Sequence, residues 1–218
     1  AVLFGAATPL MAVAAFLCSR CVVPLPNQEL SREPFLSGVF GGLWGFMTDR
    51  VLLTAAIVTV LVYTGNTIDP NMNLYTPDVL GAAPEQYAGL QLFLRFGFKA
   101  VAGLLLGWLL TRTHPKAGVL VTASFFAASL FWAMLVNGRW YLMAFGIYGA
   151  GELIGVYAPN YILSASRKSQ IRRNMAFVTM LMAPAAPAGA IFGWISDHFG
   201  RVYSPAVGFK LSFAVCAT

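Results

Sequence analysis

The chain has 218 residues, of which 58% are hydrophobic and only 10% are charged, and its net charge is +6. An ordinary soluble domain is about 25% charged, so this chain lacks the charged groups that a hydrated surface requires. The composition excludes a soluble enzyme domain, a disordered segment and a nucleic-acid binder with a basic surface. It predicts an all-α integral membrane protein.

Apolar runs follow one another along the chain, and a helix needs about 20 apolar residues to cross a bilayer. Because the runs do not alternate in polarity as barrel strands do, we expect helices. The runs predict a bundle of about seven transmembrane helices, at 1–26, 51–66, 87–110, 118–136, 140–163, 175–195 and from 205 onward. The first and last runs are incomplete, so we expect the chain to be part of a longer protein.

The predicted domains are the helix at 1–26, a cytoplasmic linker at 27–50 and a C-terminal helix bundle at 51–218. Within the linker, a short apolar stretch rich in glycine covers 35–46. Such a stretch predicts a helix lying on the membrane surface, with Trp44 at the interface. A membrane-spanning helix is the alternative.

Basic residues are distributed unevenly between the connections. Nine Lys and Arg lie in the connections 19–50, 111–117 and 164–174, and only two lie in the alternate connections 66–86, 137–140 and 196–204. Lys and Arg gather on the cytoplasmic side, so the first set is predicted to be cytoplasmic and 66–86 to be an outward loop. The protein is thus expected to be a multi-pass protein of the plasma (inner) membrane.

Three ionisable residues stand out inside the predicted spans, where a charge costs about 2.5–3.5 kcal/mol on insertion scales. Arg95 and Lys99 are four residues apart and share one helix face, and Glu152 lies near the middle of another span. We expect a polar cavity in which Arg95 and Lys99 bind a solute while Glu152 binds solute and exchanges a proton. The alternatives are a structural ion pair, and an Arg95 side chain that reaches the outer interface.

Further polar residues follow Glu152. Tyr148 and Pro159 share its face if the helix is regular, and Asn160 is one position away. We therefore expect Tyr148 and Asn160 to line the solute pathway. His114 and His198 are predicted on opposite sides of the membrane, so we expect no metal site, no cofactor and no catalytic activity.

Small residues and prolines mark predicted helix contacts. Pairs of glycines in G-x-x-x-G spacing favour close packing of helix backbones. These pairs are Gly103–Gly107, Gly151–Gly155 and Gly189–Gly193. Pro184 and Pro187 predict a kink or a hinge in the sixth span.

Two segments resemble the glycine-led turns of a known transporter family. The motif residues are Gly107, Arg112 and Lys116 in 107–116, and Gly193, Asp197 and Arg201 in 193–201. In the first segment Thr111 stands where the family has an acidic residue. Together with the order of spans and loops, these segments resemble the C-terminal half of a major facilitator superfamily transporter, helices six to twelve.

The resemblance implies half of a twelve-helix fold that works by alternating access, with a binding site near the midplane between two halves. It places Arg95 and Lys99 on helix eight and Glu152 on helix ten, and it gives the six motif residues structural or gating roles. The implied partners are the bilayer, a small solute and the N-terminal half of the same protein, with no nucleic acid.

The sequence therefore predicts a secondary active transporter for a small polar solute, working as a proton symporter through Glu152. Two bases against one acid inside the spans favour an anionic solute. The alternatives are a non-transporting scaffold or receptor on the same fold, and a membrane-embedded lipid-modifying enzyme.

Overall fold

The computed structural model describes residues 12–20 and 35–218, and the regular structure in these ranges is entirely helical. Residues 1–38 and 39–218 form two separate compact units. Residues 12–20 are helical, while the rest of the predicted span 1–26 lies outside the described residues. The prediction of an all-α protein is confirmed for the described part of the chain.

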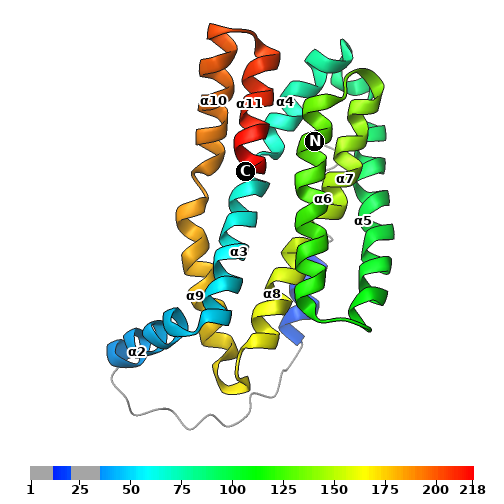
Figure 1. Ribbon diagram of the computed structural model, residues 1–218. Coiled ribbons are helices and arrows are strands. Elements are labelled where there is room, and N and C mark those ends of the chain that lie inside the picture. The colour runs from blue at the N-terminus through cyan, green and yellow to red at the C-terminus, as the bar shows by residue number, and fades with distance from the viewer. Residues whose placement is uncertain (1–11, 21–34) are drawn as a thin grey trace. The chain divides into compact units, whose positions relative to one another are not determined.

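Five helical stretches are long and apolar enough to cross a membrane (Figure 1). They are Arg50–Leu80, Ala88–Leu110, Pro115–Leu135, Gly138–Ala165 and Lys168–Val202. A shorter apolar helix, α11 (Pro205–Ala217), follows them. The five stretches coincide with the second to the sixth predicted spans. The count of seven spans and the half of a twelve-helix fold stay predictions.

Two of the five stretches are unbroken helices, α5 (Ala88–Leu110) and α6 (Pro115–Leu135). A tight turn joins them at 111–114. Helix α6 begins at a proline, which needs no hydrogen-bond acceptor in the first turn, and the His114 ring caps it by accepting from the Lys116 backbone N–H at 3.2 Å.

The other three stretches are interrupted. In the first, helix α3 (Arg50–Asn66) is followed by α4 (Asp69–Leu80). In the second, η2 (Gly138–Leu142) and α7 (Met143–Gly151) are followed by α8 (Ile154–Ala165). In the third, η3 (Lys168–Gln170) and α9 (Ile171–Met182) are followed by η4 (Ala183–Ala185) and α10 (Ala188–Val202). Prolines stand at two interruptions, Pro70 at the first and Pro184 and Pro187 at the third. A proline removes one backbone donor and crowds the preceding turn, so the helix is interrupted there.

The segment 66–86 was predicted to be a loop, and this is wrong because most of it is helical. Its position on the outward side stays a prediction. Helix α4 fills 69–80 and a short helix, η1 (Pro84–Gln86), follows it. Asp69 and Pro70 occupy the first turn of α4, where an acid and a proline are both favourable. Gly81 ends α4 with φ +60°, a left-handed conformation that glycine adopts without strain.

The stretch containing α7 and α8 lies at the centre of the unit 39–218. Its most apolar window is 67% buried, against 11–39% for the other four stretches. Helix α7 packs against α5 and α6, α8 packs against α3 and α6, and α10 pairs with α11 (Figure 1). The buried tyrosines of this stretch, Tyr141, Tyr148 and Tyr157, therefore lie among neighbouring helices.

Glycines permit the close approach of α7 to its neighbours. A Cβ at Gly149 would overlap the Arg95 carbonyl oxygen, and one at Gly151 would lie 2.8 Å from the Phe126 backbone nitrogen. Among the predicted G-x-x-x-G pairs, Gly151 alone has so close a described neighbour. A Cβ at Gly189 or at Gly103 would make an ordinary contact, at 3.4 and 3.9 Å. Around Gly107, Gly155 and Gly193 a Cβ would meet no described atom within 4 Å, so the pairs do not pack as whole motifs.

Helix α2 (Phe35–Thr48) forms where the surface helix was predicted. Its 14 residues are fewer than the roughly 20 that a spanning helix needs. Phe46 packs on Phe177 of α9 with ring centroids 5.8 Å apart, while Trp44 is exposed. The position of α2 on a membrane surface stays a prediction.

The connections of the unit 39–218 alternate between its two ends (Figure 1). The start of α3 and the turns at 111–114 and 166–170 lie at one end. The turns at 81–87, 136–137 and 203–204 lie at the other. This alternation agrees with the order of loops from which the cytoplasmic side was predicted.

Candidate functional site

A row of polar side chains runs along one face of α5. Gln91, Arg95 and Lys99 are spaced by four residues, which places them on the same face of the helix. Lys99 is the central residue of α5, and Arg95 lies one turn nearer to its start. This face meets α4 and the junction between α7 and α8.

Glu152 connects the two predicted bases. Its carboxylate accepts from Arg95 Nε at 3.1 Å and also from Arg95 Nη2. Lys99 Nζ donates to Glu152 Oε2 at 3.3 Å. The structure therefore brings Arg95, Lys99 and Glu152 together, and the Arg95–Glu152 pair has the two-pronged geometry in which a guanidinium holds a carboxylate most strongly.

A second carboxylate, which the sequence analysis placed in a loop, completes this group. Arg95 Nη1 donates to both oxygens of Asp69 at 3.3 Å. We call Asp69, Arg95, Lys99 and Glu152 the ion-pair cluster. Among residues 12–20 and 35–218, the ion pairs of this cluster are the only ones.

The cluster contains two acids and two bases, so its formal charge is balanced. The excess of one base, from which an anionic solute was predicted, is absent from the cluster once Asp69 is counted. The anionic solute stays a prediction. The cluster is also partly open, since the exposed fractions of its side chains run from 19% for Arg95 and Glu152 to 34% for Lys99.

Polar contacts continue from the cluster toward the start of α5. Asn73 Nδ2 donates to the backbone oxygen of Asp69 at 2.9 Å and to Asp69 Oδ1 at 3.2 Å. Gln91 Nε2 in turn donates to Asn73 Oδ1 at 2.5 Å. The sequence analysis missed both residues, although Gln91 lies four positions before Arg95 and its spacing was a usable signal.

Tyr148 supports the cluster from inside the protein. Its ring lies 5.1 Å from the Arg95 guanidinium carbon, a cation–π contact, and only 1% of the residue is exposed. Its hydroxyl donates to the Asn66 backbone oxygen at 3.3 Å. Pro70, four residues on, has no N–H to offer that oxygen, so Tyr148 replaces the missing helical donor.

A small cavity of about 210 Å³ lies next to Asn66, between α3, α8 and α9. We call it the Asn66 cavity. Its polar lining comes from Thr59, Tyr63, Asn66 and Thr179, and no Asp, Glu, Lys, Arg or His of the described residues lines it. Asn66 Oδ1 is buried and accepts no hydrogen bond from the described residues. A buried acceptor without a donor is costly, and in this conformation the oxygen is closed off from the cavity that the Asn66 residue lines.

A separate set of buried hydroxyls ties α4 to the last two helices. Asn71 Nδ2 donates to Ser196 Oγ at 2.8 Å and to Ser212 Oγ at 3.2 Å. All three residues are buried, and each hydroxyl donates to a carbonyl one turn back in its own helix. We assign this group to helix packing because its hydrogen bonds are internally complete.

The remaining predicted site residues lie outside the cluster. Asn160 is exposed and its side chain makes no hydrogen bond with the described residues. Arg112 stacks on Trp108, with its guanidinium carbon 4.8 Å from the ring centroid. The other motif residues, Gly107, Lys116, Gly193, Asp197 and Arg201, contact no member of the cluster through a hydrogen bond or ion pair. Their gating roles stay predictions.

No group of three or more His, Cys, Asp or Glu side chains that could hold a metal ion occurs among residues 12–20 and 35–218. The chain matches no protein-family model, no curated protein and no solved structure.

Proposed function

We propose that this chain forms part of a secondary active transporter, which moves a small polar solute across the membrane by alternating access and exchanges a proton at Glu152. The observation that carries the proposal is the ion-pair cluster, because it joins α5 to two helices that are interrupted close to it. Discontinuous helices with charged groups near the middle of the bilayer are typical of the sites of such transporters.

The free-energy cost of the cluster favours a role in transport over a purely structural role. Charges inside a membrane are expensive, and well-packed apolar residues often stabilise a fold as well as a buried ion pair does. A purely structural contact between these helices would therefore not require four ionisable side chains. Their side chains are partly exposed, and the proposal requires that this exposed face borders a water-filled path.

The hydrogen bonds suggest how a proton changes the cluster. Glu152 in its charged form holds Lys99 and two nitrogens of Arg95. A proton on Glu152 removes its charge and releases Lys99, while Arg95 keeps its contact with Asp69. The helix carrying Glu152 can then separate from α5, and this separation provides the two states that alternating access requires.

The Asn66 cavity is our candidate for part of the solute site. Its lining carries no formal charge, and a rotation of the Asn66 side chain would bring its unpaired oxygen into contact with the cavity. A neutral solute with hydroxyl or amide donors fits this lining and would supply the missing donor. Asn66 is joined to Arg95 through Tyr148, so solute in the cavity and a proton on Glu152 act on connected residues.

The test is solute-dependent proton movement. The full-length protein is reconstituted into liposomes containing a pH-sensitive dye, and a panel of sugars, polyols, amino acids, amides and carboxylates is added outside. We expect a neutral donor-bearing solute to cause acidification with the natural protein. Glu152→Gln should abolish the acidification, while the matched control Glu85→Gln, in the exposed turn before α5, should leave it unchanged.

Two outcomes would contradict the proposal. A protein that is folded in the liposomes yet moves none of the panel solutes would be a scaffold or receptor. Solute uptake that continues with unchanged proton movement in Glu152→Gln would remove Glu152 from the coupling.

A further inference from the structure

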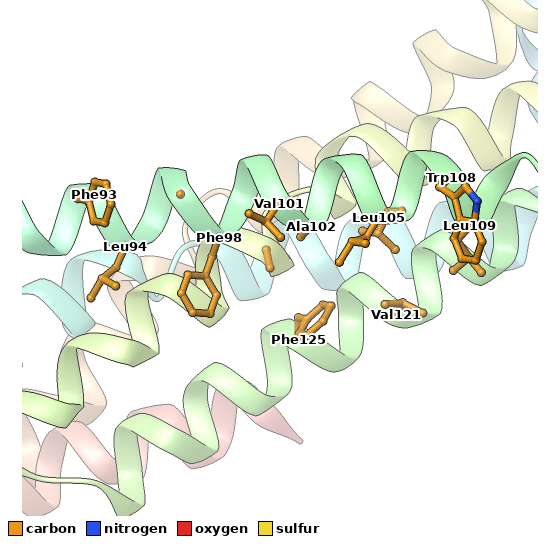
Figure 2. A pocket seen from close by; sticks show the side chains of 13 residues that line it. Phe93, Leu94, Phe98, Val101, Ala102, Leu105, Trp108, Leu109, Val121 and Phe125 are labelled. Carbon is orange, nitrogen blue, oxygen red and sulfur yellow. The ribbon is translucent and has the colours of Figure 1, made fainter.

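A long apolar groove runs between α5 and α6, and no member of the ion-pair cluster lines it. Its volume is about 680 Å³. The side chains that line it include Phe93, Phe98, Val101, Leu105, Trp108 and Phe125 (Figure 2). The lining is almost wholly hydrocarbon, with the indole nitrogen of Trp108 as its one polar side-chain atom, so the groove is poorly suited to a polar solute.

The groove is V-shaped, because α5 and α6 diverge from the turn that joins them (Figure 2). Helix α7 lies between the two helices toward the wide end, where Ala150 contributes to the lining. From Trp108 to Phe93 the groove follows α5 for about 22 Å at 1.5 Å per residue. One leaflet of a bilayer core is about 15 Å thick, so the groove accommodates one lipid acyl chain along its length.

The narrow end of the groove carries positive charge. Arg112 stacks on Trp108, which itself lines the groove. Lys116 follows in the first turn of α6, and both bases are exposed. Asp49, the acid at the same end of the described chain, is engaged in capping α3 through the Val51 and Leu52 backbone N–H groups at 3.0 and 3.2 Å. No ion pair among the described residues neutralises Arg112 or Lys116.

We propose that this groove binds an anionic phospholipid of the leaflet next to the 111–114 turn. One acyl chain lies along α5 between Phe93 and Trp108, and the phosphate contacts Arg112 and Lys116. The charge at the narrow end distinguishes this occupant from a zwitterionic lipid. The inference is independent of transport, since it uses no residue of the ion-pair cluster or of the Asn66 cavity.

The experiment uses Trp108 as the reporter. In the variant used, Phe replaces the other four tryptophans. It is reconstituted into phosphatidylcholine that contains increasing fractions of either brominated phosphatidylglycerol or brominated phosphatidylcholine. Brominated acyl chains quench tryptophan fluorescence on contact. A base near the membrane surface strengthens the binding of an anionic headgroup about fivefold. We therefore expect brominated phosphatidylglycerol to quench Trp108 fluorescence at a mole fraction at least fivefold lower than brominated phosphatidylcholine does.

Two substitutions separate the headgroup from the chain. Arg112→Gln should lower the preference for the anionic lipid about fivefold. Gly97→Leu, at a groove position where a Cβ meets no described atom within 4 Å, should fill the groove and reduce quenching by both lipids. The matched control Gly89→Leu has equal space on α5 but lies outside the groove lining, and it should change neither result.

Three outcomes would overturn the inference. The first is equal quenching by the two lipids, and the second is a preference that Arg112→Gln leaves intact. The third is the absence of quenching by either lipid, which would mean that a protein segment or a second copy of the chain covers the groove.

If the variant lacking the other tryptophans does not fold, native mass spectrometry of the natural protein with the two unbrominated lipids replaces the quenching experiment. Equal retention of the two lipids would count against the proposal.

Discussion

Arg95 is the residue on which the ion-pair cluster depends, because its guanidinium contacts carboxylates from two different helix junctions. Asp69 stands at the start of α4 and Glu152 stands between α7 and α8. Removing Arg95 would leave two acids facing one base. Replacing it with Lys would also fail, since an ammonium cannot offer the planar set of donors that reaches both carboxylates.

Substitutions of Lys99 and Glu152 should have non-additive effects on the free energy of unfolding, because the two side chains are in contact. Lys99→Gln and Glu152→Gln each leave the cluster with an unbalanced charge, whereas the double variant restores one acid and one base. Residues in one ion-pair network show coupling energies of about 0.5–3 kcal/mol. We therefore expect the double variant to be less destabilised than the sum of the singles by this amount, measured by unfolding in mixed micelles.

The matched control for this cycle is Lys168→Gln combined with Glu152→Gln. Lys168 is exposed and lies in the turn before α9. Its effect on stability should simply add to that of Glu152→Gln. An equally large coupling with Lys168 would show that net charge, rather than contact, governs the result.

Asn66→Leu should separate ligand binding from folding. The side-chain oxygen has no donor among the described residues, so its removal costs no hydrogen bond within the protein. If the solute supplies the donor, one hydrogen bond of about 0.5–1.5 kcal/mol is lost, and KM for uptake should rise about two- to tenfold. Unfolding measured in parallel should show unchanged or raised stability, and an unchanged KM would remove Asn66 from the solute site.

The sequence predicted three of the four cluster residues, because a charge inside an apolar run is conspicuous. Asp69 was missed because the polar residues of 69–80 lower the hydrophobicity of a segment that is nevertheless helical. Asn160 was expected beside Glu152 only if one regular helix ran from 148 to 160. The interruption at Glu152 and Leu153 changes the helical phase, so positions before and after it do not share a face.

At the level of helices, the interruptions decide which polar groups meet. Helix α4 starts at Asp69, and α8 starts two residues after Glu152. The N-terminal end of a helix favours negative charge and the C-terminal end does not. Each acid lies between two such ends, since Asp69 follows α3 and starts α4, and Glu152 is the C-cap of α7 and precedes α8. The prolines of the first and third interruptions were visible in the sequence. The second has no proline, and the glycines around it are its main sequence signal.

Gly149→Ala should destabilise the packing of α7 against α5. A Cβ at this position would overlap the Arg95 carbonyl oxygen, which belongs to a helix backbone and cannot rotate away. Overpacking of this kind costs about 1–3 kcal/mol, and it should also displace Arg95 from Glu152. The measurement is the free energy of unfolding in mixed micelles.

Gly155→Ala is the matched control, at the second residue of α8. A Cβ there meets no described atom within 4 Å, and replacing a helical glycine with alanine stabilises by about 0.5–1 kcal/mol. We expect the two variants to shift stability in opposite directions. Equal effects would mean that α5 and α7 are not in close contact.

For the whole molecule, the alternation of connections makes the orientation testable. A cysteine is introduced by Glu85→Cys or by Lys168→Cys into a protein whose native cysteines are replaced by alanine. A membrane-impermeant maleimide should label position 85 in intact cells, and position 168 only after permeabilisation. The opposite pattern would reverse the predicted cytoplasmic side, although the helix arrangement would stand.

Much of the arrangement in 39–218 follows from apolar length and turn residues, which are local properties of the sequence. The second to the sixth spans were predicted close to their observed positions for this reason. The central place of α7 and α8 could not be predicted in the same way, because burial depends on contacts between distant segments. The Asn66 cavity likewise depends on three helices that are separated along the chain.

The opposed directions of α4 and α8 have a consequence for inorganic ions. Both helices begin beside the ion-pair cluster, where α3 and α7 end. The negative end of each preceding helix therefore lies beside the positive end of the next helix, and the cluster itself contains two acids and two bases. Because this place carries no net charge, a sodium or potassium ion gains nothing there that offsets the loss of its hydration water. The protein is therefore expected to conduct no inorganic ions at rest.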